Sequence, residues 1–173
     1  MSDRASSWHA ALRAPRWNPN PHQPELRPKK THMMNDTTPI RAHCRCGAFQ
    51  FASTSAPILQ LVCHCQQCRE VSGQPYSNFS FFKVRDTQTT GEYRTVAFTA
   101  DSGARTVREV CAACGDMLID RTEGYPKIVG VVQECFDPEQ PFLPAHHVWT
   151  DSRLPQTVLP PATEALKLFP RGT

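Results

Sequence analysis

The stretch CHCQQCR, residues 63–69, decides the fold because it places three cysteines within six residues. In an extended strand, Cys63 and Cys65 point to the same face. Two residues separate Cys65 from Cys68, which is the spacing of a tight turn that aims two thiolates at one ion. Three soft ligands at one point indicate zinc, and a zinc ion with three protein ligands keeps an open fourth position.

Four further cysteines flank this stretch in two pairs, and each pair is followed by a glycine. They are Cys44 and Cys46 before Gly47, and Cys111 and Cys114 before Gly115. Gly115 permits the positive φ that closes a zinc knuckle. The two pairs together supply four thiolates, the closed donor set of a structural zinc. The sequence therefore predicts two zinc ions per chain, one fully enclosed and one open, exchangeable and prone to loss.

The cysteines alone leave other assignments open. An iron–sulfur cluster uses the same ligands. His64 or Cys135 is a candidate fourth ligand of the three-cysteine site, but His64 should point to the opposite face of its strand and Cys135 is expected to be a buried free thiol. Four disulfides in a secreted domain are a further alternative. Residues 1–15 contain no apolar leader, so we expect a cytoplasmic chain whose thiols stay reduced.

Length and composition bound the domain organisation. The 173 residues, 39% of them hydrophobic, suffice for one domain with a modest core. Residues 1–39 are predicted to be a disordered, proline-rich basic extension, residues 40–155 the zinc domain, and residues 156–173 a tail with a short helix over 162–169. No apolar run approaches the ~18 residues of a membrane helix.

The charge distribution argues against a nucleic-acid-binding face. Residues 1–35 carry six basic and two acidic side chains, and the whole chain has a net charge of +3. The remaining residues are therefore close to neutral, with a slight negative excess. A broad basic surface is not expected on the domain itself.

Short apolar segments separated by turn residues predict a mainly β, antiparallel domain with little helix. Residues 66–71 are expected to form one helical turn that Gly73 ends. Residues 79–84 and 92–99 are predicted to pair as a hairpin across a turn at 86–91. The predicted strands cover residues 47–52, 57–62, 79–84, 92–99, 105–110, 117–121, 127–132 and 146–150, the last at a sheet edge.

The cysteine clusters, in this order and spacing, resemble those of the glutathione-dependent formaldehyde-activating enzyme family, which is grouped with the centromere protein V domain. The resemblance covers about residues 40–155 and includes segments at 136–138 and 146–149. It implies an Mss4-like fold, with antiparallel sheets organised around zinc. It also implies two ligand sets, which are Cys44, Cys46, Cys111 and Cys114 for a structural zinc, and Cys63, Cys65 and Cys68 for a catalytic zinc.

The resemblance further implies a carbon–sulfur lyase that condenses glutathione with formaldehyde to S-hydroxymethylglutathione. Its partners are then a small thiol and a small aldehyde. The alternative is a non-catalytic zinc module for a protein or nucleic-acid partner, which the basic extension with Trp8 and Trp17 would favour. Arg69 and Arg108 lie next to the clusters in sequence and are expected to be solvated surface residues.

Overall fold

The computed structural model describes residues 38–100, 102–159 and 164–166. The chain divides into two units, residues 1–35 and 36–173, and every described element belongs to the second. The predicted extension lies outside the described residues, apart from residues 38 and 39. No helix in the described ranges is long and apolar enough to cross a membrane.

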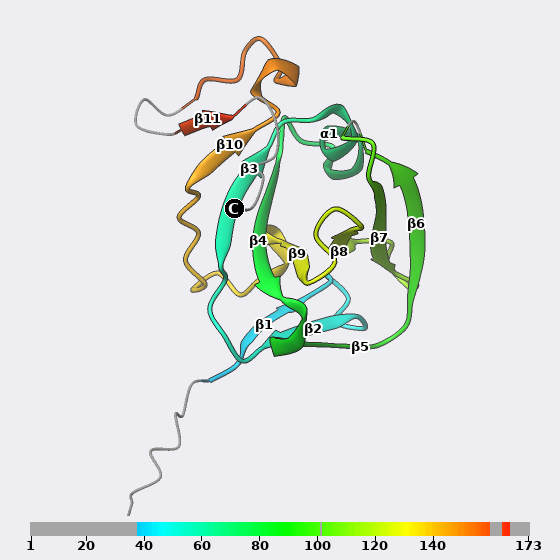
Figure 1. Ribbon diagram of the computed structural model, residues 1–173. Coiled ribbons are helices and arrows are strands. Elements are labelled where there is room, and N and C mark those ends of the chain that lie inside the picture. Colours follow the sequence, from blue (N-terminus) through cyan, green and yellow to red (C-terminus); the bar gives the residue numbers. More distant parts are fainter. Residues whose placement is uncertain (1–37, 101, 160–163, 167–173) are drawn as a thin grey trace, which may run out of the picture. The chain divides into compact units, whose positions relative to one another are not determined.

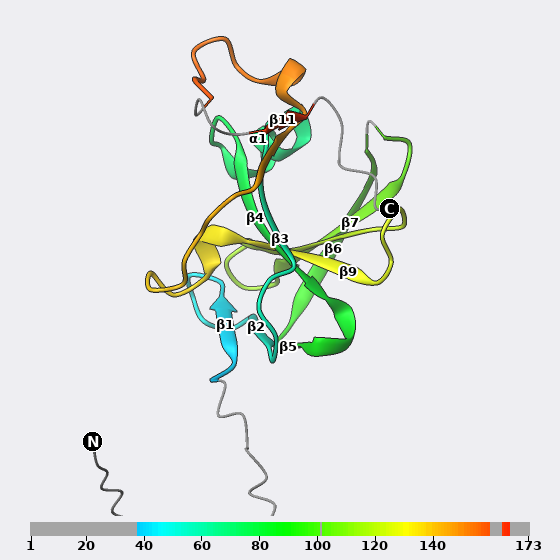
Figure 2. The ribbon, with the colours of Figure 1, turned by 60° about the vertical axis from the view of Figure 1, so that its left-hand side comes forward.

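Strands dominate this unit and form two sheets, which confirms the prediction of a mainly β fold (Figures 1 and 2). The smaller sheet contains β1 (Ile40–His43), β2 (Gln50–Ser53) and β5 (Thr87–Thr90). The larger sheet contains, in spatial order, β11 (Glu164–Leu166), β10 (His146–Val148), β3 (Leu59–Cys63), β4 (Ser77–Lys83), β9 (Ile128–Val132), β8 (Met117–Thr122), β7 (Arg105–Cys111) and β6 (Tyr93–Thr99). All pairings are antiparallel except those of β10, which runs parallel to both β3 and β11.

The helical elements of the described residues are short. The α-helix α1 (Gln66–Ser72) follows the three-cysteine stretch, and Gly73 ends it with a φ of 65°, as predicted. The 3-10 helices are η1 (Val84–Asp86), η2 (Gln133–Cys135) and η3 (Thr150–Ser152).

The larger sheet curves so that β3 and β4 lie across from β6 and β7, with α1 at one end (Figure 1). Side chains that alternate along its strands fill two separate cores. On β4, Phe82 packs into the core that contains the β1–β2 segment, whereas Phe79 and Phe81 pack against the three-cysteine stretch. Each core thus contains one of the cysteine-rich regions.

The predicted hairpin between residues 79–84 and 92–99 is wrong. Residues 87–90, expected in its turn, form β5, which pairs with β2 in the smaller sheet, and β6 pairs with β7. Threonine-rich segments favour strands, and here that preference prevails over turn formation. Gly91 lets the chain leave β5 because its φ is 96° and a Cβ there would lie 1.8 Å from the Ala48 carbonyl oxygen.

The C-terminal prediction also differs from the structure. Residues 164–166 form β11 instead of the predicted helix over 162–169, and the other residues of that window lie outside the described ranges. Pairing with β10 provides hydrogen-bond partners for the backbone N–H and C=O groups of this segment, so a helix is not needed to satisfy them. As a result, residues 146–148 are not at the sheet edge, because β10 lies between β3 and β11.

Candidate metal centres

The first cysteine pair lies in the tight loop between β1 and β2. The Cys44 N–H donates to the Phe49 carbonyl at 3.0 Å, and the Gly47 N–H donates to the Cys44 carbonyl at 2.8 Å. Gly47 adopts a φ of 74°, which glycine tolerates without steric cost. The Phe49 N–H also donates to Cys44 Sγ at 3.3 Å, so the loop holds this sulfur in place and favours its thiolate form.

The second pair forms the predicted knuckle between β7 and β8. The Gly115 N–H donates to the Cys111 carbonyl at 3.0 Å, and the Cys111 N–H donates to the Asp116 carbonyl at 2.9 Å. Gly115 has a φ of 78° and closes the turn after Cys114. The end of β7 and the start of β8 therefore fix both sulfurs of this pair.

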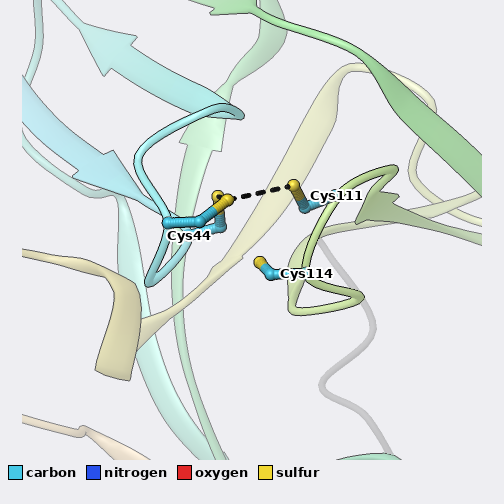
Figure 3. A group of neighbouring side chains, drawn as sticks. Cys44, Cys111 and Cys114 are labelled. Carbon is cyan, nitrogen blue, oxygen red and sulfur yellow. Dashed lines mark hydrogen bonds between the residues drawn. The ribbon is translucent and has the colours of Figure 1, made fainter.

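The two loops bring their four sulfurs to within 4.8 Å of one another. Figure 3 shows the sulfurs of Cys44, Cys111 and Cys114 pointing toward a common centre. Cys46 Sγ lies 3.4 Å from Cys44 Sγ and 3.7 Å from Cys111 Sγ. A tetrahedral zinc with ~2.3 Å bonds to sulfur separates its ligands by roughly 3.8 Å, whereas a disulfide bond measures about 2.05 Å. These four residues fit a zinc ion and do not form disulfides with one another.

An ionic contact joins the rims of the two loops. Arg45 Nη2 lies 2.9 Å from one carboxylate oxygen of Asp116, and the Arg45 N–H donates to the other at 2.9 Å. The same guanidinium donates to the Cys114 carbonyl at 3.2 Å. Segments about 70 positions apart in the chain are thus connected beside the sulfurs.

The three-cysteine site lies where β3 ends and α1 begins. Cys63 is the last residue of β3, and Cys65 is the N-cap of α1, where its Sγ accepts a hydrogen bond from the Cys68 N–H at 3.4 Å. The three sulfurs lie within 4.8 Å of one another, and all three residues are buried. The sequence therefore predicted both cysteine groups correctly as spatial clusters.

Each cluster contains a cysteine whose pKa is lowered by its neighbours, so that its thiolate form is favoured. Hydrogen bonds from Cys63 and Cys68 lower the pKa of Cys65 to about 3. The hydrogen bond to Cys65 raises the pKa of Cys63 well above its usual range. Burial raises the pKa of Cys44, but hydrogen bonds from the Phe49 N–H and the neighbouring thiols outweigh that effect and lower the pKa to about 6. Crowded soft donors that already carry negative charge suit a zinc ion.

Neither alternative fourth ligand joins the three-cysteine group in the described structure. His64 turns away from the sulfurs, and its Nε2 shares a hydrogen bond of 2.9 Å with His147 Nδ1. Burial lowers the pKa of His64 to about 4, so its ring is neutral. Cys135 Sγ instead lies 3.6 Å from the Met117 carbonyl, outside both groups, and its side chain is half-buried.

The expectation that Arg108 is a solvated surface residue is wrong. Its side chain is buried, and Nη2 lies 3.7 Å from Cys68 Sγ. Nε donates to Asp120 Oδ2 at 3.3 Å, Nη1 donates to the Gln67 carbonyl at 3.2 Å, and the guanidinium carbon lies 4.4 Å from the centre of the Phe98 ring. An ion pair, a stacked ring and carbonyl bonding together offset the desolvation of this charge.

Arg69 also has a structural position, since its guanidinium donates to the carbonyls of His64 and Ser152. It thereby ties the three-cysteine stretch to η3.

A cavity of about 830 Å³ opens beside the three-cysteine cluster, and all three of these cysteines line it. The strands β3, β4, β6, β7, β8 and β9 contribute to its wall, so it occupies the concave side of the larger sheet. Phe79, Phe81, Phe98 and Trp149 supply much of its apolar lining. Burial raises the pKa of Asp120, which lines the same cavity, although Arg108 counteracts that effect.

Sequence reasoning missed Arg108, Asp120 and Phe98 as parts of this site. One signal was available: the doublets Arg108-Glu109 and Asp120-Arg121 flank the second knuckle and are complementary in sign. In the structure Arg108 lies directly opposite Asp120 in the β7–β8 ladder. Opposite charges at facing positions stabilise such a pair. The approach of Arg108 to Cys68, 40 positions earlier in the chain, had no local signal.

Comparison with known proteins gave one family match. The model of the family described as glutathione-dependent formaldehyde-activating enzyme matches residues 39–152. Among solved structures, a crystal structure of a Rhodobacter sphaeroides protein is similar with a TM-score of 0.47 and 16% sequence identity, covering 59% of this chain and 92% of that one. A comparison with curated proteins gave no match.

Proposed function

Because this chain belongs to the family of glutathione-dependent formaldehyde-activating enzymes, we propose that it is a zinc-dependent carbon–sulfur lyase that promotes addition of a thiol to an aldehyde. Glutathione is the proposed thiol and formaldehyde the reference aldehyde. One observation carries the proposal: three buried sulfurs converge in the wall of a cavity, and no further Cys, His, Asp or Glu of the described residues completes their group. We assign this activity to residues 40–155.

In this proposal the two cysteine groups have different tasks. The set with four sulfurs would hold a structural zinc, and Cys63, Cys65 and Cys68 would hold the catalytic one. When bound by three thiolates, zinc lowers the pKa of a thiol in its open position and keeps it as a nucleophilic thiolate. We place the activity in a reducing compartment, the cytoplasm, where such cysteines stay free.

The residues around the cavity support this chemistry in two ways. Arg108 holds its guanidinium beside Cys68 and thereby offsets part of the negative charge of the sulfurs. Phe98 and Trp149 supply apolar surface to the cavity in which the reacting groups would meet. In the reaction, the thiol sulfur bonds to the carbonyl carbon, the π electron pair moves to the carbonyl oxygen, and the proton lost by the thiol ends on that oxygen.

The test follows exchange between free formaldehyde and S-hydroxymethylglutathione by NMR, with and without the zinc-loaded full chain. We expect acceleration by the wild-type protein and loss of most of it in Cys65→Ser. Cys135→Ser is the matched control because Cys135 lies outside both clusters, and it should behave like wild type. Absence of acceleration by zinc-loaded wild-type protein would refute the activity.

A further inference from the structure

We propose that the cavity beside the three-cysteine cluster selects an uncharged, apolar substrate that carries a ring or a branched alkyl group. This inference rests on the proposed function and specifies the substrate class of the same site. It follows from the size of the cavity, from the nature of its lining and from the pairing of its charges.

The size of the cavity exceeds what a one-carbon aldehyde needs. Its volume of about 830 Å³ falls within the ~300–1,000 Å³ range of pockets that enclose drug-sized ligands. Formaldehyde would leave most of this space unfilled. A substrate that matches the cavity therefore has a much larger group attached to its reacting centre.

The lining of the cavity is largely aromatic and aliphatic. Phe79 and Phe81 from β4, Phe98 from β6 and Trp149 after β10 contribute rings, and Ile58 contributes an aliphatic side chain. Apolar surface that leaves water on contact with this lining gives roughly 25 cal/mol per Å². A ring-bearing or branched substrate gains from that contact, whereas a peptide backbone would lose hydrogen bonds to water.

The charges in the cavity wall already pair with each other. Arg108 is the only Lys or Arg among the described lining residues, and its partner Asp120, 3.3 Å away, is the only carboxylate among them. The guanidinium also stacks on Phe98 and donates to the Gln67 carbonyl. A substrate carboxylate deep in this cavity would find no unpaired cation, and burying it unpaired is costly. The group that fills the cavity is therefore uncharged.

Two reactants can supply such a group, because it can be attached to the aldehyde or to the thiol. Benzaldehyde with glutathione represents the first case, and formaldehyde with benzyl mercaptan the second. Rates with the zinc-loaded chain are compared for both pairs, for formaldehyde with glutathione, and for 4-carboxybenzaldehyde with glutathione. We expect one ring-bearing pair to exceed the formaldehyde–glutathione pair. Where that pair is benzaldehyde with glutathione, the carboxylated aldehyde should be slower than benzaldehyde by about tenfold or more.

A binding measurement tests the cavity without relying on turnover. The fluorescent probes N-phenyl-1-naphthylamine and 8-anilino-1-naphthalenesulfonate share one ring scaffold and differ by a sulfonate. On the zinc-loaded full chain, the uncharged probe should bind at least about tenfold more tightly than the anionic one. Benzaldehyde or benzyl mercaptan should displace it. Equal affinities, or no binding of the uncharged probe, would overturn the inference.

A pair of variants tests whether the probe binds in this cavity. Ile58 lines the cavity but is half exposed, so the Ile58→Asp variant should still fold. Its affinity for the uncharged probe should be lower by about fivefold or more. Leu143→Asp is the control, because Leu143 is exposed and does not line the cavity, and it should leave binding unchanged. Unchanged binding in Ile58→Asp would overturn the inference.

The two proposals can fail separately. Acceleration of the formaldehyde–glutathione pair alone would support the proposed function and overturn the substrate class. Selective binding of the uncharged probe without acceleration of any pair would support the apolar selectivity of the cavity and refute the lyase activity.

Discussion

Two cysteines of the four-cysteine cluster reach solvent, since Cys46 is exposed and Cys114 half-buried, while Cys44 and Cys111 are fully buried. In the three-cysteine cluster every member is buried, and Cys63, Cys65 and Cys68 are only 7%, 7% and 6% exposed. Reactive cysteines are normally sought among partly exposed ones. Here the exposed and half-buried cysteines belong to the group with a complete set of four donors, whereas all three cysteines of the smaller group are buried. Exposure to solvent therefore does not mark the site that we propose to be reactive, which differs from the other cluster in its number of donors and in its contact with a cavity.

The surroundings of the two clusters differ in the same way. Cys44 and Cys111 belong to the core that joins segments of both sheets, together with Phe49 and Leu118. Cys63, Cys65 and Cys68 instead belong to the second core, on the concave face of the larger sheet. Removing the first cluster should therefore disrupt the fold, and removing the second should disrupt only the site.

Substituting one cysteine in each cluster should give the largest difference. Cys111→Ser removes one of the four sulfurs that we propose to hold a structural zinc, and because such an ion supplies on the order of 10 kcal/mol, the domain should unfold. Cys65→Ser should leave the domain folded with about one metal ion fewer per chain. Metal content and circular dichroism measure both effects. Unfolding in both variants, or in neither, would remove the distinction between the clusters.

Gly91, where the end of β5 lies close to the loop that carries Cys44 and Cys46, should be the next most sensitive position to substitution. A Cβ in Gly91→Ala would lie 1.8 Å from the Ala48 carbonyl oxygen, so the loop that carries Cys44 must move, at a cost of about 3 kcal/mol or more. Gly103→Ala is the matched control because its φ is also positive, 83°, but a Cβ there meets nothing within 4 Å. It should cost only about 1–2 kcal/mol. Urea unfolding of the zinc-loaded variants measures both, and similar costs would show that the backbone conformation alone is responsible.

The cysteine spacings were sufficient to predict both clusters from the sequence. Ligands two or three positions apart are brought together by local geometry, so Cys63, Cys65 and Cys68 need only a strand end and one helical turn. The pairing of the two outer knuckles was also predictable, since four thiolates make a closed donor set.

The parts that could not be predicted depend on contacts between distant segments. The Thr87–Thr90 segment lies among turn-like residues, and its threonines realise their preference for a strand because the edge of β2 is available for pairing. Sequence alone predicts Arg108 to be a surface residue. Its burial depends on the pairing of β7 with β8, which places Asp120 opposite it, and on the curvature of the sheet, which brings Cys68 within reach. Strand pairing and sheet curvature were needed to find the cavity.

The buried ion pair beside the three-cysteine cluster should be sensitive to loss of one partner. The side chains of Arg108 and Asp120 are only 6% and 18% exposed, so Arg108→Met leaves a buried carboxylate unpaired and should cost about 3 kcal/mol. The double variant Arg108→Met with Asp120→Asn removes both charges and should recover much of that loss. Denaturant unfolding of both single variants and the double variant gives the coupling energy. Additive costs would mean that the two groups do not stabilise each other.

The arginine beside the four-cysteine cluster should matter least, although it bridges the two knuckles directly. The side chains of Arg45 and Asp116 are 75% and 26% exposed, and water and salt screen such a pair, so Arg45→Ala should cost less than about 1 kcal/mol. Arg85→Ala is the matched control, because Arg85 and Asp86 are 77% and 25% exposed and lie outside both clusters. Thermal unfolding should give similar small shifts for both variants. A loss of stability in Arg45→Ala as large as that in Arg108→Met would mean that the contact of Arg45 with the Cys114 carbonyl supports the sulfurs. The four-cysteine cluster would then depend on its rim as much as the three-cysteine cluster depends on its ion pair.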